Sequence, residues 1–201
     1  MPVAIKKSPI RGNTDFDYDL AIRQRNERRL RTLLKHQIAP PKTCLIYAYQ
    51  LGHTELLPVL LDAGADPNYI GNRGWTVMGD CILHSDIPTL KFLLNRGADP
   101  NRGFGGEPAI VNAARVGNVE VLRLLVDAGA SLFDDPRVAP NALFEAIARG
   151  HTEIVRYLLA QGVSCNSRKP FGKTAMEWAA EKGTPEIQEL IRNRRHRKKR
   201  T

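Results

Sequence analysis

The sequence predicts an all-α solenoid of stacked helix–turn–helix units joined by short hairpin-like loops. One glycine register recurs at spacings of 33, 32 and 33 residues: Gly64, Gly97, Gly129 and Gly162. A second register recurs with the same period: Gly52, Ser85, Gly117, Gly150 and Gly183. The segments between the registers carry apolar residues at helical spacing. A fixed period of this size is the signature of a repeat architecture, in which each unit buries its apolar face against its neighbours.

Each unit opens with a short helix that is rich in small residues. Three examples are AIVNAARVG (109–117), LFEAIARG (143–150) and AMEWAAEKG (175–183). The residue of the second register ends each of these helices, so a tight turn follows it and leads into a second helix.

The second helix of each unit carries apolar residues at positions i, i+3 and i+4, which form one helical face. The sets are Leu57, Leu60 and Leu61; Leu90, Leu93 and Leu94; Leu122, Leu125 and Val126; and Val155, Leu158 and Leu159. A glycine of the first register follows each helix and can adopt the left-handed conformation of a C-cap. Pro58 lies within the first of these helices, where proline removes a hydrogen bond, so we expect that helix to start late or to bend.

The loop Gly64-Ala65-Asp66-Pro67-Asn68, which nearly repeats at Gly97, is predicted to be a turn and not a repeated ligand site. Proline cannot extend the helix, and the Asp and Asn side chains can satisfy turn backbone. The continuation YIGNRGWT is of more interest, because the turn itself does not require the aromatic residues Tyr69 and Trp75.

This pattern resembles the ankyrin-repeat family over roughly residues 17–194. The resemblance is carried by the segments Gly52-His53-Thr54-Glu55-Leu56-Leu57, Leu60-Leu61-Asp62-Ala63-Gly64-Ala65-Asp66-Pro67-Asn68 and Gly150-His151-Thr152-Glu153-Ile154-Val155. The family's Thr-Pro-Leu-His opening is incomplete, and no unit retains its His. The hydrogen bonds of that His must therefore be absent or replaced, and we expect an array less regular and less stable than a consensus one.

We expect the chain to hold a whole array with two capping units. The predicted parts are a flexible segment 1–16, a basic N-terminal capping repeat 17–40, repeats at about 41–71, 72–104, 105–137 and 138–169, a C-terminal cap 170–194 and a basic tail 195–201. Polar Arg29 and Thr32 replace one apolar stripe in the first unit, and Gln188 and Arg192 replace the other stripe in the last. Terminal repeats need one polar outer face each.

The composition favours a monomeric cytoplasmic or nuclear protein. No apolar run of signal-peptide length follows the first residues, and nowhere do eighteen apolar residues follow one another. Cys44, Cys81 and Cys165 are too widely spaced for a zinc site or a disulfide framework, so we expect ordinary thiols.

The family resemblance implies a non-enzymatic module that binds another protein through its loop tips and the concave face of its first helices. By position, the expected partner-binding residues are Tyr47, Tyr69, Arg73, Trp75, Asp80, His84, Phe104, Asn112, Arg115, Phe133, Glu145, Arg149, Phe171 and Trp178. Aromatic residues and Arg are enriched in binding hot spots. The alternative for each ring at a loop tip is that it packs on the neighbouring hairpin.

We predict no catalytic residue, cofactor or metal. GFGGEP (103–108) follows no strand and lacks the Gly-Lys-Ser/Thr of a nucleotide-binding loop. Asp80 and His84 are spaced as an acid–base pair or half of a metal site, but no third group has a suitable spacing.

The charge distribution leaves a second function open, namely binding to nucleic acid or to another anionic surface. The net charge is +6 over residues 1–42, −4 over 43–191 and +7 over 192–201. The tail contributes Arg192, Arg194, Arg195, Arg197, Lys198, Lys199 and Arg200, and we expect it to be solvated and mobile. Arg25, Arg28, Arg29, Arg31 and Lys35 form a basic helix face near the start. The alternative for both basic segments is that they are ordinary solvated surface and bind no anionic partner.

Overall fold

The computed structural model describes residues 14–36, 38–133, 138–166 and 172–198. Across these ranges the chain forms twelve α-helices and two short 3₁₀-helices and no β-strand, which confirms the all-α repeat prediction. The chain divides into two compact units, Met1–Tyr69 and Ile70–Thr201, and each is described separately.

The first unit contains two helical pairs. α1 (Thr14–Arg23) packs on α2 (Glu27–Lys35), and α3 (Cys44–Gln50) packs on α4 (Leu57–Asp62). Tyr18, Leu30, Leu45 and Leu60 are fully buried in its core. The Tyr18 hydroxyl donates a 2.6 Å hydrogen bond to the carbonyl of Ile38, so this aromatic side chain satisfies its polar end while its ring fills the core.

Pro58 shortens helix α4, the second helix of its repeat, as predicted. Residues Thr54–Leu56 form a 3₁₀ turn, η1, and α4 begins only at Leu57, with Pro58 in its first turn. The corresponding helix α10 (Thr152–Ala160) has no proline and begins three residues earlier in the repeat. Proline is tolerated in the first turn because no intrahelical bond is lost there.

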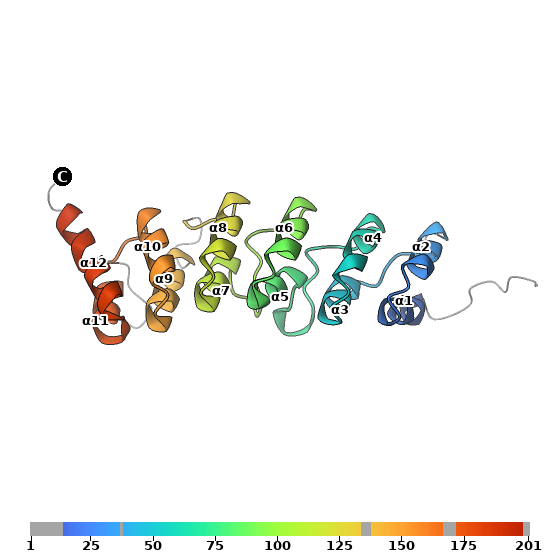
Figure 1. Ribbon diagram of the computed structural model, residues 1–201, viewed down its shortest axis with the longest axis horizontal. Helices are drawn as coiled ribbons and strands as arrows, with labels where there is room; N and C mark the ends of the chain where they lie inside the picture. The colour runs from blue at the N-terminus through green and yellow to red at the C-terminus, as the bar shows by residue number, and fades with distance from the viewer. Residues whose placement is uncertain (1–13, 37, 134–137, 167–171, 199–201) are drawn as a thin grey trace, which may run out of the picture. The chain divides into compact units, whose positions relative to one another are not determined.

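The second unit contains four helical pairs in two layers (Figure 1). The first helices of the pairs are α5 (Val77–His84), α7 (Ala109–Val116), α9 (Val138–Arg149) and α11 (Ala175–Lys182). The second helices are α6 (Ile87–Asn95), α8 (Val119–Asp127), α10 and α12 (Pro185–Lys198). Within each layer every helix contacts the next one, so the apolar faces of successive pairs close a continuous core.

Glycines end the second helices in the way that the period predicts. Gly97 and Gly129 have φ values of 87° and 94°, which is the left-handed region that a C-cap requires. Ser85 ends the first helix of its repeat, at a position where the other repeats have glycine. Its φ is 54°, so the repeat imposes the left-handed backbone even on a residue with a Cβ.

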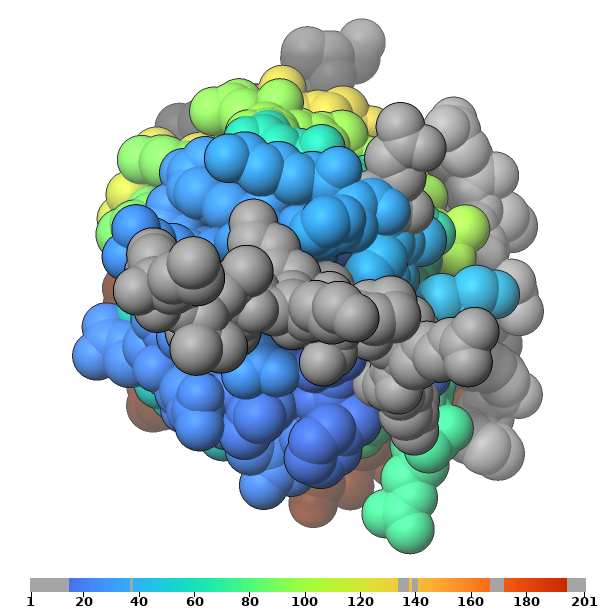
Figure 2. Space-filling model, turned by 90° about the vertical axis from the view of Figure 1, so that its right-hand side faces the viewer, coloured from blue at the N-terminus to red at the C-terminus, as the bar shows by residue number. Residues whose placement is uncertain are grey.

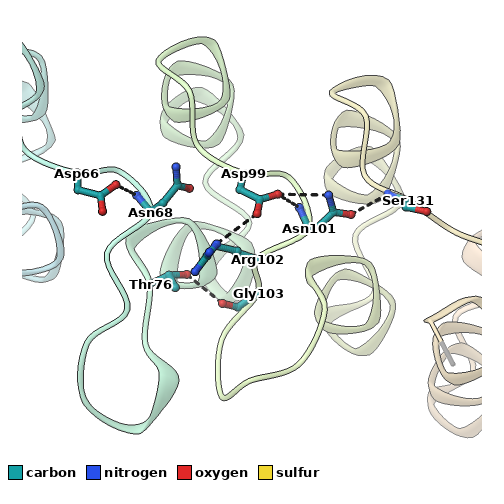
Figure 3. A network of polar contacts seen from close by, with 8 residues as sticks. All are labelled: Asp66, Asn68, Thr76, Asp99, Asn101, Arg102, Gly103 and Ser131. Atoms are coloured by element: carbon teal, nitrogen blue, oxygen red, sulfur yellow. Dashed lines mark hydrogen bonds and ion pairs between the residues drawn. The ribbon is translucent and has the colours of Figure 1, made fainter. Parts of the chain in front are cut away.

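The Asp-Pro-Asn turns act as scaffold (Figure 3). Asp66 Oδ1 accepts a 2.8 Å bond from the amide of Asn68, and Asp99 Oδ1 accepts a 3.0 Å bond from the amide of Asn101. Asn101 Oδ1 in turn accepts from the amide of Ser131 in the next repeat, at 2.8 Å. These side chains are occupied with turn and inter-repeat backbone, which confirms the turn prediction.

Thr76 supplies contacts where the family's Thr-Pro-Leu-His opening is incomplete. Its Oγ1 accepts from the amide of Gly79 at 2.8 Å, and it donates to the carbonyl of Gly103 at 3.0 Å. Thr76 therefore caps α5 and ties this unit to the following loop. The lower stability expected for the array remains a prediction.

Helix α12 continues from Pro185 to Lys198, so the first part of the basic run is helical. The expectation that the tail is solvated and mobile stays a prediction. Cations near a helix C-terminus interact favourably with the helix dipole, which offsets part of the repulsion between like charges.

Candidate functional site

Two consecutive loops of the second unit form the candidate site. We call residues 70–76 and 101–108 the paired finger loops. In the first loop, the amide of Gly71 donates to the carbonyl of Trp75 at 2.7 Å, and Asn72–Gly74 forms the 3₁₀ turn η2. In the second loop, Arg102 and Pro108 form an antiparallel bridge. Each loop is therefore a closed hairpin-like element.

The tips of the paired finger loops are joined to each other. The amide of Gly105 donates to the carbonyl of Gly74 at 3.0 Å. The Trp75 and Phe104 rings stack with centroids 5.8 Å apart and planes inclined by 17°. For this pair the alternative of packing between neighbouring hairpins is correct, because each half-buried ring covers the other. The two loops therefore present one preorganised tip.

Arg73 projects from this tip with a backbone that arginine rarely adopts. Its φ and ψ are 59° and 23°, which is the left-handed region and costs a residue with a Cβ about 1 kcal/mol. The side chain is exposed, and no described residue forms an ion pair or hydrogen bond with its guanidinium. Unusual backbone at an exposed, unpaired charge is the kind of feature that marks binding loops.

A hollow of about 240 Å³ lies between the paired finger loops. Apolar and backbone atoms dominate its lining, which comprises Ile70, Gly74, Thr76, Gly103, Gly106 and Pro108 together with polar Asn101, Arg102 and Glu107. Ile70 is 50% exposed, which is unusual for a large aliphatic side chain in this protein.

The hollow could not be predicted from the sequence, because two loops about thirty residues apart form it jointly. One available signal was the density of glycines at both tips, Gly71 and Gly74 in one loop and Gly105 and Gly106 in the other. Glycine allows two backbones to approach closely.

Two predicted contact residues are buried, and the prediction that they touch a partner is wrong. Asn112 is 0% exposed, and its Oδ1 accepts a 2.8 Å bond from the amide of Phe104. Asp80 is 2% exposed in the first turn of α5. Both were placed on the concave face by repeat position, but Asn112 instead shapes the second finger loop.

The hydrogen bond that joins Asp80 to His84 uses the Asp80 backbone. His84 Nδ1 lies 2.8 Å from the Asp80 carbonyl oxygen, which is an ordinary contact within one helix turn and gives no support to an acid–base pair. The His84 side chain is exposed. Among the described residues, no group of three His, Cys, Asp or Glu side chains could hold a metal ion.

The first helices of the second unit carry a ladder of ion pairs. Arg115 lies 3.6 Å from Glu107 and 3.3 Å from Glu145, and Glu145 lies 3.4 Å from Arg149. Trp178 is half-buried, with its ring edge-on to Phe144 at 6.2 Å. This surface is therefore largely compensated in charge, and a partner would have to compete with internal pairs to use it.

The first unit contains the predicted contact residues Tyr47 and Tyr69, which are both half-buried. The Arg23 guanidinium lies 5.5 Å from the centre of the Tyr47 ring, so one face of that ring is already covered. Burial, with a hydrogen bond to Asp19, raises the pKa of the Tyr47 hydroxyl.

Three of the five cations on the basic face near the start of the chain form internal ion pairs. Arg25 binds Glu55 at 2.6 Å, Arg29 binds Asp17 at 2.7 Å and Arg31 binds Glu27 at 2.6 Å. Over residues 14–69 seven Lys/Arg are matched by seven Asp/Glu. The formal charge of residues 14–69 is thus balanced, although α1 and α2, shown in blue in Figure 2, keep an excess of two positive charges over residues 14–36. This balance weakens the expectation of an anion-binding cap.

The remaining predicted residues lie at or beyond the limits of the described ranges. Phe133 is 59% exposed, and Phe171 lies outside the described residues. In the tail, Arg192 is exposed and Arg194 half-buried, and the backbone of Arg195, Arg197 and Lys198 is helical. Lys199 and Arg200 lie outside the described residues.

Two findings concern the chain as a whole. No helix in the described part of the chain is both long and apolar enough to cross a membrane. Cys44, Cys81 and Cys165 form no disulfide, and burial raises the pKa of the Cys44 thiol to about 12. A thiol of such high pKa stays protonated and is a poor nucleophile.

Comparison with known proteins agrees with the stacked helical pairs. The family described as "Ankyrin repeats (3 copies)" matches residues 19–103 and 110–200. The "BRCA1-associated RING domain protein 1" of Caenorhabditis elegans is 32% identical over 125 residues, covering 62% of this chain and 18% of that protein. The "L-asparaginase" of Dirofilaria immitis is 27% identical over 163 residues, covering 81% of this chain and 27% of that protein.

A third relative is the "Ankyrin repeat and KH domain-containing protein" of Caenorhabditis briggsae, 32% identical over 114 residues, or 54% of this chain and 4% of that protein. The chain spans less than a third of the length of each of these three relatives, whose names point to different activities. The similarity thus concerns the repeats. Since the repeat match covers most of the sequence, the chain belongs to the ankyrin-repeat family.

Proposed function

We propose that this chain is a non-enzymatic adaptor, scaffold or inhibitor that binds another protein through its finger loops and first helices. Ankyrin repeats are generally protein–protein interaction modules and generally non-catalytic, which supports this proposal. The observation that carries it is the preorganised tip of the paired finger loops, which presents an unpaired cation, Arg73, beside a half-exposed aliphatic side chain, Ile70.

Rigid loops are well suited to binding. Association costs less when the contacting side chains are already ordered, and the Trp75–Phe104 stack and the Gly105–Gly74 hydrogen bond supply that order here. Exposed Arg and large apolar residues are also the side chains that binding hot spots favour. The residues that we propose as contacts in the second unit are Arg73, Trp75, His84, Phe104, Arg115, Phe133, Glu145, Arg149, Phe171 and Trp178. In the first unit they are Tyr47 and Tyr69.

Affinity capture from the native lysate tests the proposal. The wild-type chain is compared with an Ile70→Ser/Arg73→Glu double variant and with Arg28→Glu as a charge-reversal control. Arg28 is exposed on α2 and forms no ion pair with any of the described residues. The proposal predicts bound proteins that Arg28→Glu retains and the double variant loses. Equal capture by all three chains, or none by the wild type, contradicts it.

Binding to nucleic acid or another anionic surface is a second candidate, and the helical course of the tail favours it. α12 carries five Lys/Arg from Arg192 to Lys198. Ile191 is the last buried residue before them, so deleting residues 192–201 leaves the core in place. If this candidate is correct, a labelled DNA duplex binds the full chain with a steep salt dependence and does not bind the deletion variant. Protein capture should survive the same deletion.

We also propose that the protein is a monomer of the cytoplasm or nucleus. Cys44 and Cys81 are buried and form no disulfide, which supports a reducing compartment. Sedimentation of the purified chain at several concentrations tests the monomer, and imaging of the tagged chain with and without residues 192–201 tests the compartment.

A further inference from the structure

We infer that the hollow between the paired finger loops receives one large apolar side chain of a partner protein, next to an acidic residue that pairs with Arg73. This inference rests on the proposed function and specifies the chemistry of the segment that binds.

The size of the hollow suits one side chain. Its volume is about 240 Å³. Pockets that hold complete small ligands are commonly larger, about 300–1,000 Å³. Ile70 and Pro108 offer apolar contact. Gly106 also lines the hollow, and a Cβ added there would meet no atom within 4 Å.

The charges around the hollow favour an acidic neighbour. Arg102 Nε binds Asp99 at 3.2 Å, and Glu107 lies 3.6 Å from Arg115, so these lining charges are compensated within the protein. Arg73 directly precedes the lining residue Gly74 and has no partner among the described residues. The charge left over beside the hollow is therefore one positive guanidinium, which a carboxylate complements.

The geometry of the tip favours the same kind of partner. The left-handed backbone of Arg73 is held between the Gly71–Trp75 hydrogen bond of 2.7 Å and the Gly105–Gly74 hydrogen bond of 3.0 Å. The position from which the guanidinium extends is thus ordered before a partner arrives, whereas the long side chain itself stays accessible.

Titration of the full-length chain with short peptides, followed by amide NMR signals, tests the inference. The probe is the blocked peptide Gly-Glu-Trp-Glu-Gly. One control replaces both Glu by Lys, and the other replaces Trp by Ala. We expect the amides of Gly74, Gly103 and Gly106 to shift with the probe. The Lys control should bind about threefold to fivefold more weakly, since an exposed ion pair contributes up to about 1 kcal/mol. The Ala control should also bind more weakly, because it lacks the large apolar side chain that fills the hollow.

The protein variant Arg73→Gln provides the matched test of the charge. This substitution should weaken binding of the probe about threefold, since an exposed ion pair contributes modestly. It should not weaken binding of the Lys peptide. Any of three results overturns the inference. These are amide shifts that lie outside the paired finger loops, equal binding of the three peptides, and an Arg73→Gln variant that binds the probe as tightly as the wild type.

Two further measurements identify what occupies the hollow. Phe16 is 61% exposed between Asp15 and Asp17, so a second copy of this chain offers a similar segment. Concentration-dependent association that Phe16→Ser abolishes would make the chain itself the occupant and overturn the proposed partner. If lysate proteins are captured by the wild type and equally by Ile70→Ser, the hollow is not the site, whereas the proposed function stands.

Discussion

Replacing Gly103 by alanine perturbs the second finger loop at its most crowded point. A Cβ at this position would overlap Asn112 Oδ1 and lie 2.5 Å from the carbonyl oxygen of Glu107 and 3.0 Å from the amide nitrogen of Ala109. Two of these three obstacles are backbone atoms, which cannot rotate away. The loop must therefore move, and the 2.8 Å bond from the Phe104 amide to Asn112 Oδ1 is the first contact at risk.

The expected loss of stability has two contributions. Breaking the buried Phe104–Asn112 hydrogen bond and leaving its groups unsatisfied costs about 1–3 kcal/mol. Displacing packed backbone to admit a methyl group costs about 1–3 kcal/mol more. We therefore expect Gly103→Ala to lower the free energy of unfolding by about 2–6 kcal/mol.

Gly105→Ala in the same loop is the matched control. Gly105 has a φ of 66° and no atom within 4 Å of its added Cβ, so only the left-handed backbone opposes the substitution, at about 1 kcal/mol. Urea unfolding followed by far-UV circular dichroism measures both variants, provided that their m-values agree.

A Gly103→Ala variant that is no more destabilised than Gly105→Ala would refute the clash at Gly103. If the added methyl group acts through Asn112, then Asn112→Ala costs less in the Gly103→Ala background than in the wild type. Additive losses would show that the methyl group does not act through Asn112.

Three further predictions concern other positions. Arg73→Gly should raise the midpoint of urea unfolding or leave it unchanged, because glycine relieves the left-handed backbone by up to about 1 kcal/mol, and a clear fall would show that the Arg73 side chain stabilises the fold. Gly117→Ala should be more destabilising than Gly129→Ala by about 1–2 kcal/mol. Both glycines have φ 94°, but only the Cβ at Gly117 meets the His151 ring, at 2.7 Å from each nitrogen, and equal losses would refute the clash. Burial opposes ionisation of Asp99, but hydrogen bonds from Asn101 and Arg102 outweigh it and lower the pKa of this carboxyl below 3.8. The Asp99 carboxylate therefore stabilises the fold above about pH 4, and this stabilisation is lost as the pH falls through the lowered pKa. Asp99→Asn should accordingly lose less stability than the wild type between neutral pH and about pH 3 in thermal unfolding scans.

The repeat and its turns could be predicted because their causes are local. The C-cap at Gly97 needs a left-handed φ, the Asp99–Asn101 turn needs a side-chain acceptor two residues before an amide, and α4 starts late because of Pro58. Each of these rules operates within a few residues, so the sequence alone reveals it.

The site could be predicted only in part, because its geometry depends on distant segments. Repeat position assigned Asn112 to the concave face, but the preceding loop folds over it and takes its amide oxygen. The arginines of α2 look basic in sequence, yet Arg29 pairs with Asp17 on the neighbouring helix. The stack of Trp75 on Phe104 joins two repeats in the same way. In each case a tertiary contact decides what the side chain does.

Amide hydrogen exchange of the full-length chain, alone and with the protein captured from lysate, tests the central claim most directly. If the paired finger loops are the binding surface, exchange slows at residues 70–76 and 101–108 when the partner is bound, and this protection is lost in the Ile70→Ser/Arg73→Glu variant. Protection confined to residues 192–198, with unchanged exchange in both loops, would contradict it.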